Sequence, residues 1–142
     1  MKTRTQLFEW MQKQKVAFVA SIDEEGFPNI KAMFTARIIE GNRFYFSTNT
    51  SSLRAQQFMK NPKASVYFYS EGRSGPEGLM LSGTMNVRQD AAAKESIWRD
   101  GDTIYYPLGV TDPDYCVFEF TALRGRSYSF SGVESFDMED LL

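Results

Sequence analysis

The sequence contains no histidine and only one cysteine, Cys116. The absence of histidine excludes Ser-His-Asp and Cys-His catalytic arrangements, histidine-based zinc sites and haem held by a histidine ligand. A single cysteine excludes an intramolecular disulfide, which fits the reducing cytoplasm. Chemistry is left to carboxylates, lysine, tyrosine, Cys116 or a bound cofactor, and a cofactor is the simplest solution because it carries the reactive atoms itself. No catalytic residue and no metal site stands out.

The chain also lacks a strong charge of one sign and a long hydrophobic run. Its formal net charge is −2, with lysine and arginine scattered, whereas proteins that bind nucleic acid usually carry a clustered basic surface. No apolar run approaches the ~20 residues that cross a bilayer, and the polar N-terminus does not resemble a signal peptide. We therefore expect a cytoplasmic protein that binds neither nucleic acid nor membranes.

Alternating apolar residues predict a mainly β domain with short helices. Thr3 and Gln6 form a capping box that predicts a helix over residues 4–14, and Asp90 caps a helix that ends near Arg99. A further short helix should lie between Ser52 and Asn61. Strands are expected over residues 16–22, 29–39, 43–48, 63–69 and 79–87, with a loop over 71–78, and 115–130 should form one long strand or two strands around Gly125.

These elements fit one small domain. The connections are short, so the sheet should be antiparallel, and six strands in so short a chain close most economically as a barrel with peripheral helices. We expect this single domain to cover residues 1–132. Residues 133–142 are rich in acidic side chains and are expected to form a loosely held tail.

The segment from Pro28 to Phe68 is the most specific part of the sequence. It should bring Lys31, the strand end at Ser47 and Thr48, and the turn with Ser52 and Arg54 to one end of a hairpin. Two cations, several hydroxyl groups and a helix N-terminus would suit a phosphate group. The alternative is that Ser51 caps the helix while Lys31 and Arg54 are solvated charges, and spacing alone favours that alternative.

The ordered motifs add a family resemblance that covers nearly the whole chain up to about Tyr128. The motifs are Pro28 with Lys31, then Phe46-Ser47-Thr48-Asn49, Ser52 with Arg54, Asn61-Pro62, Trp98, Tyr105-Tyr106-Pro107-Leu108-Gly109 and Asp112-Pro113. Together they resemble the pyridoxamine 5′-phosphate oxidase-like superfamily of FMN-binding split β-barrels, in particular its short general stress protein-like branch. The fold implied is a six-stranded antiparallel split β-barrel.

The resemblance implies a cofactor and its site. It implies FMN at the interface of a homodimer, with Lys31, Ser52 and Arg54 on the phosphate and Ser47 and Thr48 beside them. The backbone of Ala32, Met33 and Phe34 would follow the isoalloxazine ring, and Trp98 and Tyr106 are candidates for the wall that the partner subunit adds.

The chain departs from the true oxidases of this superfamily at three points. It has Lys31 and Leu53 where they have arginine, so Lys31 lacks the planar guanidinium fork and Leu53 removes one cation. It also lacks the histidine of their substrate-phosphate signature, and we therefore do not expect a role in pyridoxine biosynthesis.

These observations lead to one leading expectation and several alternatives. We expect an FMN-dependent oxidoreductase that acts on an unknown small-molecule substrate, with NADH or NADPH as a possible electron donor. The alternatives are a non-catalytic flavin-binding module of a stress response, or a relative that binds the deazaflavin F420 or haem on the same barrel. An absorption spectrum of the purified protein would distinguish a flavin from the other ligands.

Overall fold

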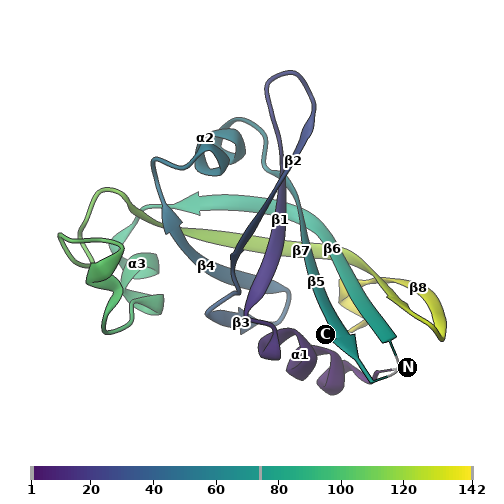
Figure 1. Cartoon of the computed structure of the whole chain (residues 1–142). Helices are drawn as coiled ribbons and strands as arrows, with labels where there is room; N and C mark the ends of the chain where they lie inside the picture. Colours follow the sequence, from purple (N-terminus) through teal and green to yellow (C-terminus); the bar gives the residue numbers. More distant parts are fainter. Residues whose placement is uncertain (1, 74, 142) are drawn as a thin grey trace.

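One antiparallel sheet of eight strands forms the body of the chain in the computed structural model, which describes residues 2–73 and 75–141 (Figure 1). The strands are β1 (Val16–Ile22), β2 (Pro28–Phe34), β3 (Ile38–Glu40), β4 (Arg43–Asn49), β5 (Lys63–Gly72), β6 (Gly75–Arg88), β7 (Tyr115–Ser129) and β8 (Gly132–Asp137). Their order is β2-β1-β5-β6-β7-β4-β3, and β8 pairs with β7. The mainly β, antiparallel architecture is as expected.

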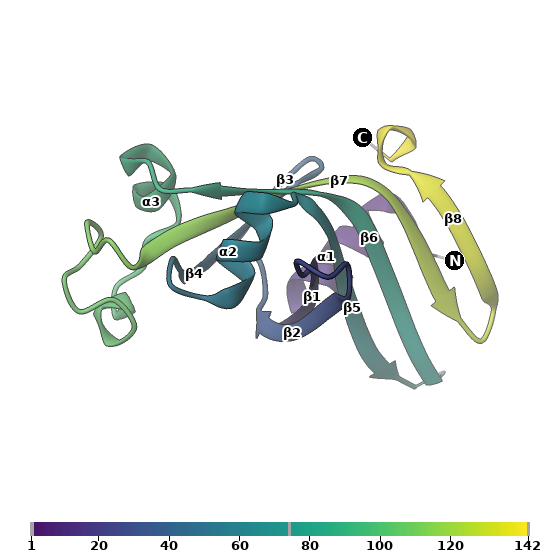
Figure 2. The same ribbon diagram turned by 90° about the horizontal axis from the view of Figure 1, so that it is seen from above.

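The two strands at the ends of the sheet are consecutive in the chain, so the sheet must curl to bring them near each other. β2 and β3 lie at opposite ends of the strand order, yet only residues 35–37 separate them. The view from above shows β6 and β7 running the length of the curved sheet (Figure 2). The expected single strand over 29–39 is therefore two strands with an interruption, and β3 is one of the two strands beyond the expected six.

Each of three helices follows directly on a residue whose side chain caps it. The helices are α1 (Arg4–Lys13), α2 (Leu53–Lys60) and α3 (Ala91–Ile97). The predicted capping box is confirmed, because the Gln6 amide N–H donates to Thr3 and the Thr3 amide N–H donates to the Gln6 side chain. Ser52, rather than Ser51, caps α2, and Asp90 caps α3. Within the described ranges, no helix combines the length and apolar character needed to cross a bilayer.

Phenylalanine dominates the core on the inner side of the sheet. Phe44 lies between Phe68 and Phe120, with ring centroids 6.3 and 5.9 Å away, and Phe58 of α2 meets Phe118 edge to face at 5.4 Å. Burial of large aromatic side chains is a major source of folding free energy. Because Phe58 fixes α2 on this core, the first turn of α2 also has a fixed position relative to the sheet.

The C-terminal residues are more regular than expected. β7 is one continuous strand, and β8 pairs with it from Ser129↔Gly132 to Arg124↔Asp137. Gly125 makes room for this pairing, because a Cβ atom there would lie 2.6 Å from the Phe136 ring. The short 3-10 helix η2 (Met138–Asp140) then buries Met138 in the core. The expectation of a loosely held tail over 133–142 is therefore corrected for residues 133–141, where apolar residues among the acidic ones fix the chain, while residue 142 lies outside the described residues.

The expected loop over 71–78 is likewise mostly strand where the structure describes it, and residue 74 lies outside the described residues. β5 and β6 continue to the pair Gly72↔Gly75. Backbone pairing in this hairpin extends beyond the apolar alternation from which the strand ends were predicted, so the sequence pattern underestimated both strands.

Candidate cofactor-binding site

A cavity of about 300 Å³ opens where the sheet is interrupted between β2 and β3. The residues that line it come from β1, β2, the 35–37 interruption, β4, α2 and the loop after α3: Val16, Ala32, Met33, Phe34, Thr35, Arg37, Ser47, Thr48, Asn49, Arg54, Tyr105 and Tyr106. This volume is at the lower end of the range for small-molecule pockets. The fold thus brings the Pro28–Phe68 segment together with Tyr105 and Tyr106, which lie almost forty residues beyond its end.

Arg54 supplies a cation to this cavity from the first turn of α2. Its side chain is half-buried, and its Nε atom is buried with no hydrogen-bond partner among the described residues. Burial lowers the pKa of the Arg54 guanidinium, although arginine remains protonated in proteins. An incompletely paired cation beside a cavity is costly unless an anion joins it.

The loop before α2 is held by hydrogen bonds within the protein. The Asp114 carboxylate accepts from the Ser51 amide N–H at 2.8 Å and from the Asn49 side chain at 2.9 Å, and these bonds lower its pKa. Ser52 uses its oxygen to accept from the Ala55 N–H at 3.1 Å. The Ser51 amide is therefore already occupied, whereas the Ser52 hydroxyl keeps its proton for another acceptor.

Two tyrosines form an aromatic wall of the cavity. Tyr106 is only 4% exposed, and its hydroxyl lies 2.9 Å from the Ser47 hydroxyl. Burial raises the pKa of Tyr106, so the phenol stays neutral near pH 7. Trp98 packs behind this wall, with its ring centroid 6.1 Å from Tyr106 and 5.3 Å from Tyr115. Within this subunit, Trp98 therefore packs against Tyr106 and does not line the cavity.

A buried ion pair fixes both the interruption and the aromatic wall. The Arg37 guanidinium donates to both oxygens of the Asp102 carboxylate and to the Ile97 carbonyl oxygen. This pairing with Arg37 lowers the pKa of Asp102. The Asp102 carbonyl oxygen accepts from the Tyr105 and Tyr106 amides, each at 2.9 Å. Asp102 therefore connects the cavity edge at Arg37 with the two tyrosines.

Most of the site residues expected from the sequence meet at the cavity. The structure brings seven of them to its lining: Ala32, Met33, Phe34, Ser47, Thr48, Arg54 and Tyr106. The other four lie outside the lining: Lys31 is exposed on β2, Ser52 caps α2, Leu53 is 66% exposed, and Trp98 lies behind Tyr106.

Sequence reasoning missed five of the lining residues: Val16, Thr35, Arg37, Asn49 and Tyr105. The alternation over residues 29–39 predicts one regular strand that includes Thr35 and Arg37, and no local pattern marks the interruption. The role of Asp102 in holding Arg37 was also missed, because the two residues are far apart in the chain. Tyr105 did carry a signal, since it belongs to the Tyr-Tyr-Pro motif.

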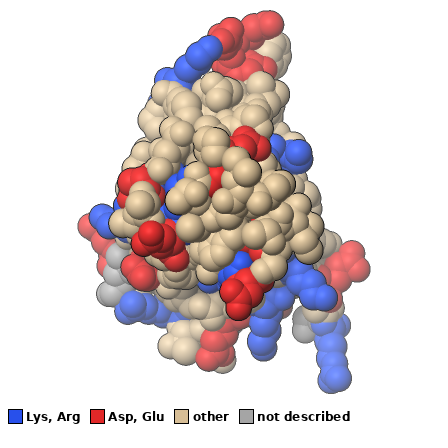
Figure 3. All heavy atoms as spheres, turned by 90° about the vertical axis from the view of Figure 1, so that its left-hand side faces the viewer, with Lys and Arg blue, Asp and Glu red and all other residues tan. Residues whose placement is uncertain are grey.

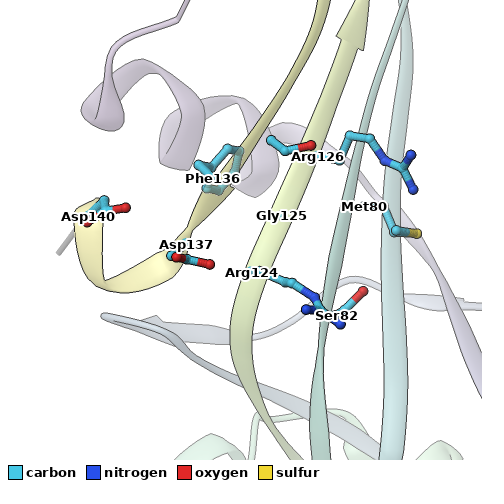
Figure 4. A pocket seen from close by; sticks show the side chains of 9 residues that line it. Met80, Ser82, Arg124, Gly125, Arg126, Phe136, Asp137 and Asp140 are labelled. Carbon is cyan, nitrogen blue, oxygen red and sulfur yellow. The ribbon is translucent and has the colours of Figure 1, made fainter.

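A larger hollow, of about 460 Å³, lies between β6, β7 and β8. In Figure 4 the Arg124 side chain extends toward Ser82, whereas Arg126 extends past β6 near Met80. Asp137 and Asp140 line the same hollow, so acidic and basic groups offset one another there. None of the expected site residues lines it, and the cavity at the β2–β3 interruption is the better candidate despite its smaller volume.

Comparisons with known proteins agree on the family. Residues 3–129 match the family described as pyridoxamine 5′-phosphate oxidase. A protein from Clostridium acetobutylicum, related to general stress protein 26 of Bacillus subtilis, shares 37% identity over 98% of this chain and 96% of its own, with a TM-score of 0.85.

Other similarities are more limited. The pyridoxine/pyridoxamine 5′-phosphate oxidase of Legionella pneumophila is 37% identical over 51 residues, which are 36% of this chain and 23% of that protein. A haem-binding protein from Mycobacterium smegmatis has a TM-score of 0.77 at 16% identity, covering 99% of this chain and 60% of its own, and therefore shows the fold alone. On the family match and the full-length relative together, this chain belongs to the pyridoxamine 5′-phosphate oxidase-like family of split β-barrels.

Proposed function

We propose that this protein binds FMN in the cavity at the β2–β3 interruption and works as a flavin-dependent oxidoreductase on a small molecule. The observation that carries the proposal is Arg54, whose buried Nε atom lacks a partner among the described residues although it borders a cavity. Such a group is stabilised by an anion, and a phosphate accepts hydrogen bonds from guanidinium with good geometry.

The rest of the cavity fits FMN in chemical character. Arg54 and the Ser52 hydroxyl would hold the phosphate, and Lys31 on β2 would supply a second, exposed cation. Met33, Phe34 and the tyrosines would offer apolar surface to a flat ring. Bound FMN supplies hydride and electron transfer. The protein's own part is to bind, to orient and to exclude water, since no lining residue stands out as a general acid or base.

A second copy of the chain would complete the site. The outer face of β2 exposes Ile30 (71%) and Phe34 (75%), and Val16 and Phe18 of β1 are also exposed beside them. Phe34 additionally lines the cavity. A contiguous apolar face of this kind typically marks an interface. We propose a homodimer that buries this face and covers the cavity, consistent with the small volume found within one subunit.

The side of the molecule that carries α3 supports the same conclusion. Its central surface has few charged groups (Figure 3). Exposed Ile104, Tyr105 and Leu108 lie in the loop after α3, and Leu53 lies at the start of α2. A surface with few charged groups is suited to contact with a partner subunit, because charge depletion is typical of the centre of an interface.

Titration of the purified protein with FMN tests the main proposal. We expect saturable binding with a changed flavin absorption spectrum, and the proposal fails if no binding is detected. Oxidation of NADH or NADPH by the FMN-loaded protein distinguishes an enzyme from a non-catalytic flavin module. The absence of histidine disfavours the haem alternative. A titration with F420 in place of FMN tests the deazaflavin alternative.

Sedimentation measurements test the dimer. Ile30→Asp places a carboxylate on the proposed interface and should yield monomers, whereas Val133→Asp changes an equally exposed apolar residue of β8 and should leave the dimer intact. A monomeric wild-type protein would refute the dimer while leaving FMN binding by one subunit to be judged by titration.

A further inference from the structure

The Thr35 hydroxyl is a second polar group at the cavity that the fold does not explain. Thr35 lines the cavity, and its Oγ1 atom is buried without a hydrogen-bond partner among the described residues. A buried hydroxyl without a partner destabilises a protein by about 1–3 kcal/mol. Valine has nearly the same shape and would avoid this cost, so packing alone does not account for threonine at this position.

The backbone around Thr35 is held on both sides. The Thr35 amide N–H donates to the Lys15 carbonyl oxygen at 3.0 Å, and the Arg37 amide N–H donates to the Tyr45 carbonyl oxygen at 2.8 Å. The Arg37 side chain is bound to Asp102 and to the Ile97 carbonyl oxygen. The interruption is therefore a fixed element, and the hydroxyl position depends on rotation about one stiff side-chain bond.

We propose that the Thr35 hydroxyl hydrogen-bonds an uncharged polar group of the flavin, a carbonyl oxygen or a ring N–H, and thereby helps to determine ligand specificity. This inference rests on the proposed function. A hydroxyl both donates and accepts, which suits such groups. Arg37, its neighbour on the cavity, is unsuited because Asp102 and Ile97 already engage its guanidinium. Arg54 carries a charge and suits the phosphate, so the two unpaired groups would recognise different parts of one ligand.

The test compares Thr35→Val, which removes the hydroxyl at constant shape, with Thr35→Ser, which retains it. Each variant is titrated with FMN and with riboflavin, which has the same ring but no phosphate. We expect Thr35→Val to lower the affinity for both flavins by about three- to tenfold, the effect of one neutral hydrogen bond. Thr35→Ser should bind both within about twofold of wild type.

Thermal unfolding without ligand gives an independent readout. Because the hydroxyl has no partner in the ligand-free protein, we expect Thr35→Val to unfold at the same temperature as wild type or higher. Lower ligand affinity together with undiminished ligand-free stability identifies a group kept for a ligand and not for the fold.

Three results would overturn the inference while leaving FMN binding in place. They are unchanged affinity of Thr35→Val for both flavins, a lower unfolding temperature of ligand-free Thr35→Val, and a loss of affinity in Thr35→Ser equal to that in Thr35→Val. A wild-type protein that binds neither flavin refutes the proposed function itself, and the inference with it.

Discussion

Gln57 and Arg54 lie three residues apart on α2, and they differ in whether their buried polar atoms have hydrogen-bond partners. Gln57 is 7% exposed, and both its side-chain oxygen and its side-chain nitrogen have partners: the oxygen accepts from the Ser21 hydroxyl and the NH2 group donates to the Asn29 side chain at 3.2 Å. Asn29 in turn donates to Asp23. Arg54 has a buried Nε atom without a partner among the described residues. One helix thus carries a polar group that holds the structure together and another that suits a ligand.

The contrast separates stability from binding. Buried polar groups are normally hydrogen-bonded, and the few exceptions call for an explanation. Here the described exceptions, Arg54 Nε and Thr35 Oγ1, both belong to residues of the same cavity. Substitutions of the paired groups should therefore impair folding, whereas substitutions of the unpaired groups should impair ligand binding.

The largest effect is expected at Asp102, a fully paired group beside the cavity. Asp102→Ala leaves the Arg37 guanidinium without its counter-ion in a buried site and should lower the free energy of unfolding by about 3–5 kcal/mol. Urea-induced unfolding measures this change. Glu24→Ala, which removes the exposed pair with Lys60, should produce no measurable change. Comparable losses of unfolding free energy in the two variants would contradict the claim that burial makes the Arg37–Asp102 pair more important for stability than the exposed pair.

The next largest effect is expected in binding, at Arg54. Arg54→Met retains much of the side-chain length and removes the charge, so the affinity for FMN should fall by about 10- to 100-fold. The affinity for riboflavin should be unchanged, and the ligand-free stability should be unchanged or higher, because Arg54 Nε has no protein partner to lose and its burial is costly. Isothermal titration calorimetry with both flavins measures the difference, and an equal loss for both would show that Arg54 does not contact the phosphate.

A smaller loss of stability is expected at Gln57. Gln57→Leu leaves the Ser21 hydroxyl and the Asn29 side chain without this partner and should cost about 1–3 kcal/mol of unfolding free energy. The matched control is Gln56→Leu, which changes the exposed neighbouring glutamine and should have little effect. If Gln57→Leu were as stable as wild type while binding FMN less tightly, the distinction between Gln57 and Arg54 would be wrong.

The smallest effect is a pH dependence in the loop before α2. The pKa of Asp114 is lowered from its ordinary value of 3.8 by hydrogen bonds with Ser51 and Asn49. The stabilisation from this carboxylate is therefore fully present above that value and is lost as the pH falls through the lowered pKa. Protection of the Ser51 amide against hydrogen exchange, relative to the intrinsic rate at each pH, should fall over this range, and Asp114→Asn should remove this pH dependence.

Local sequence signals predicted much of the fold and part of the site. The Thr3–Gln6 capping box, the Asp90 cap and the hairpins depend on near neighbours in the chain, and the alternation of β1 and β6 identifies them as strands. Ser47, Thr48 and Arg54 were expected together because β4 leads directly into α2.

The features that were missed depend on distant partners. The Arg37–Asp102 pair joins residues 65 positions apart, and no local pattern indicates it. β8 forms because β7 continues beyond the core and offers it an edge, and Gly125 makes room for Phe136. The sequence places Ile30 and Phe34 on one apolar face, but only the sheet topology shows that this face points away from the core.

The three residues between β2 and β3 limit how far the protein can adapt to a larger molecule. The four Cα–Cα steps from Phe34 to Ile38 reach about 14 Å when fully extended. The distance between these two strand ends is therefore bounded by a covalent tether, and exchanging lining side chains can deepen the cavity but cannot move the strand ends further apart than that reach. To engineer this barrel for bulkier ligands, one would insert residues here and adjust the rest of the scaffold afterwards.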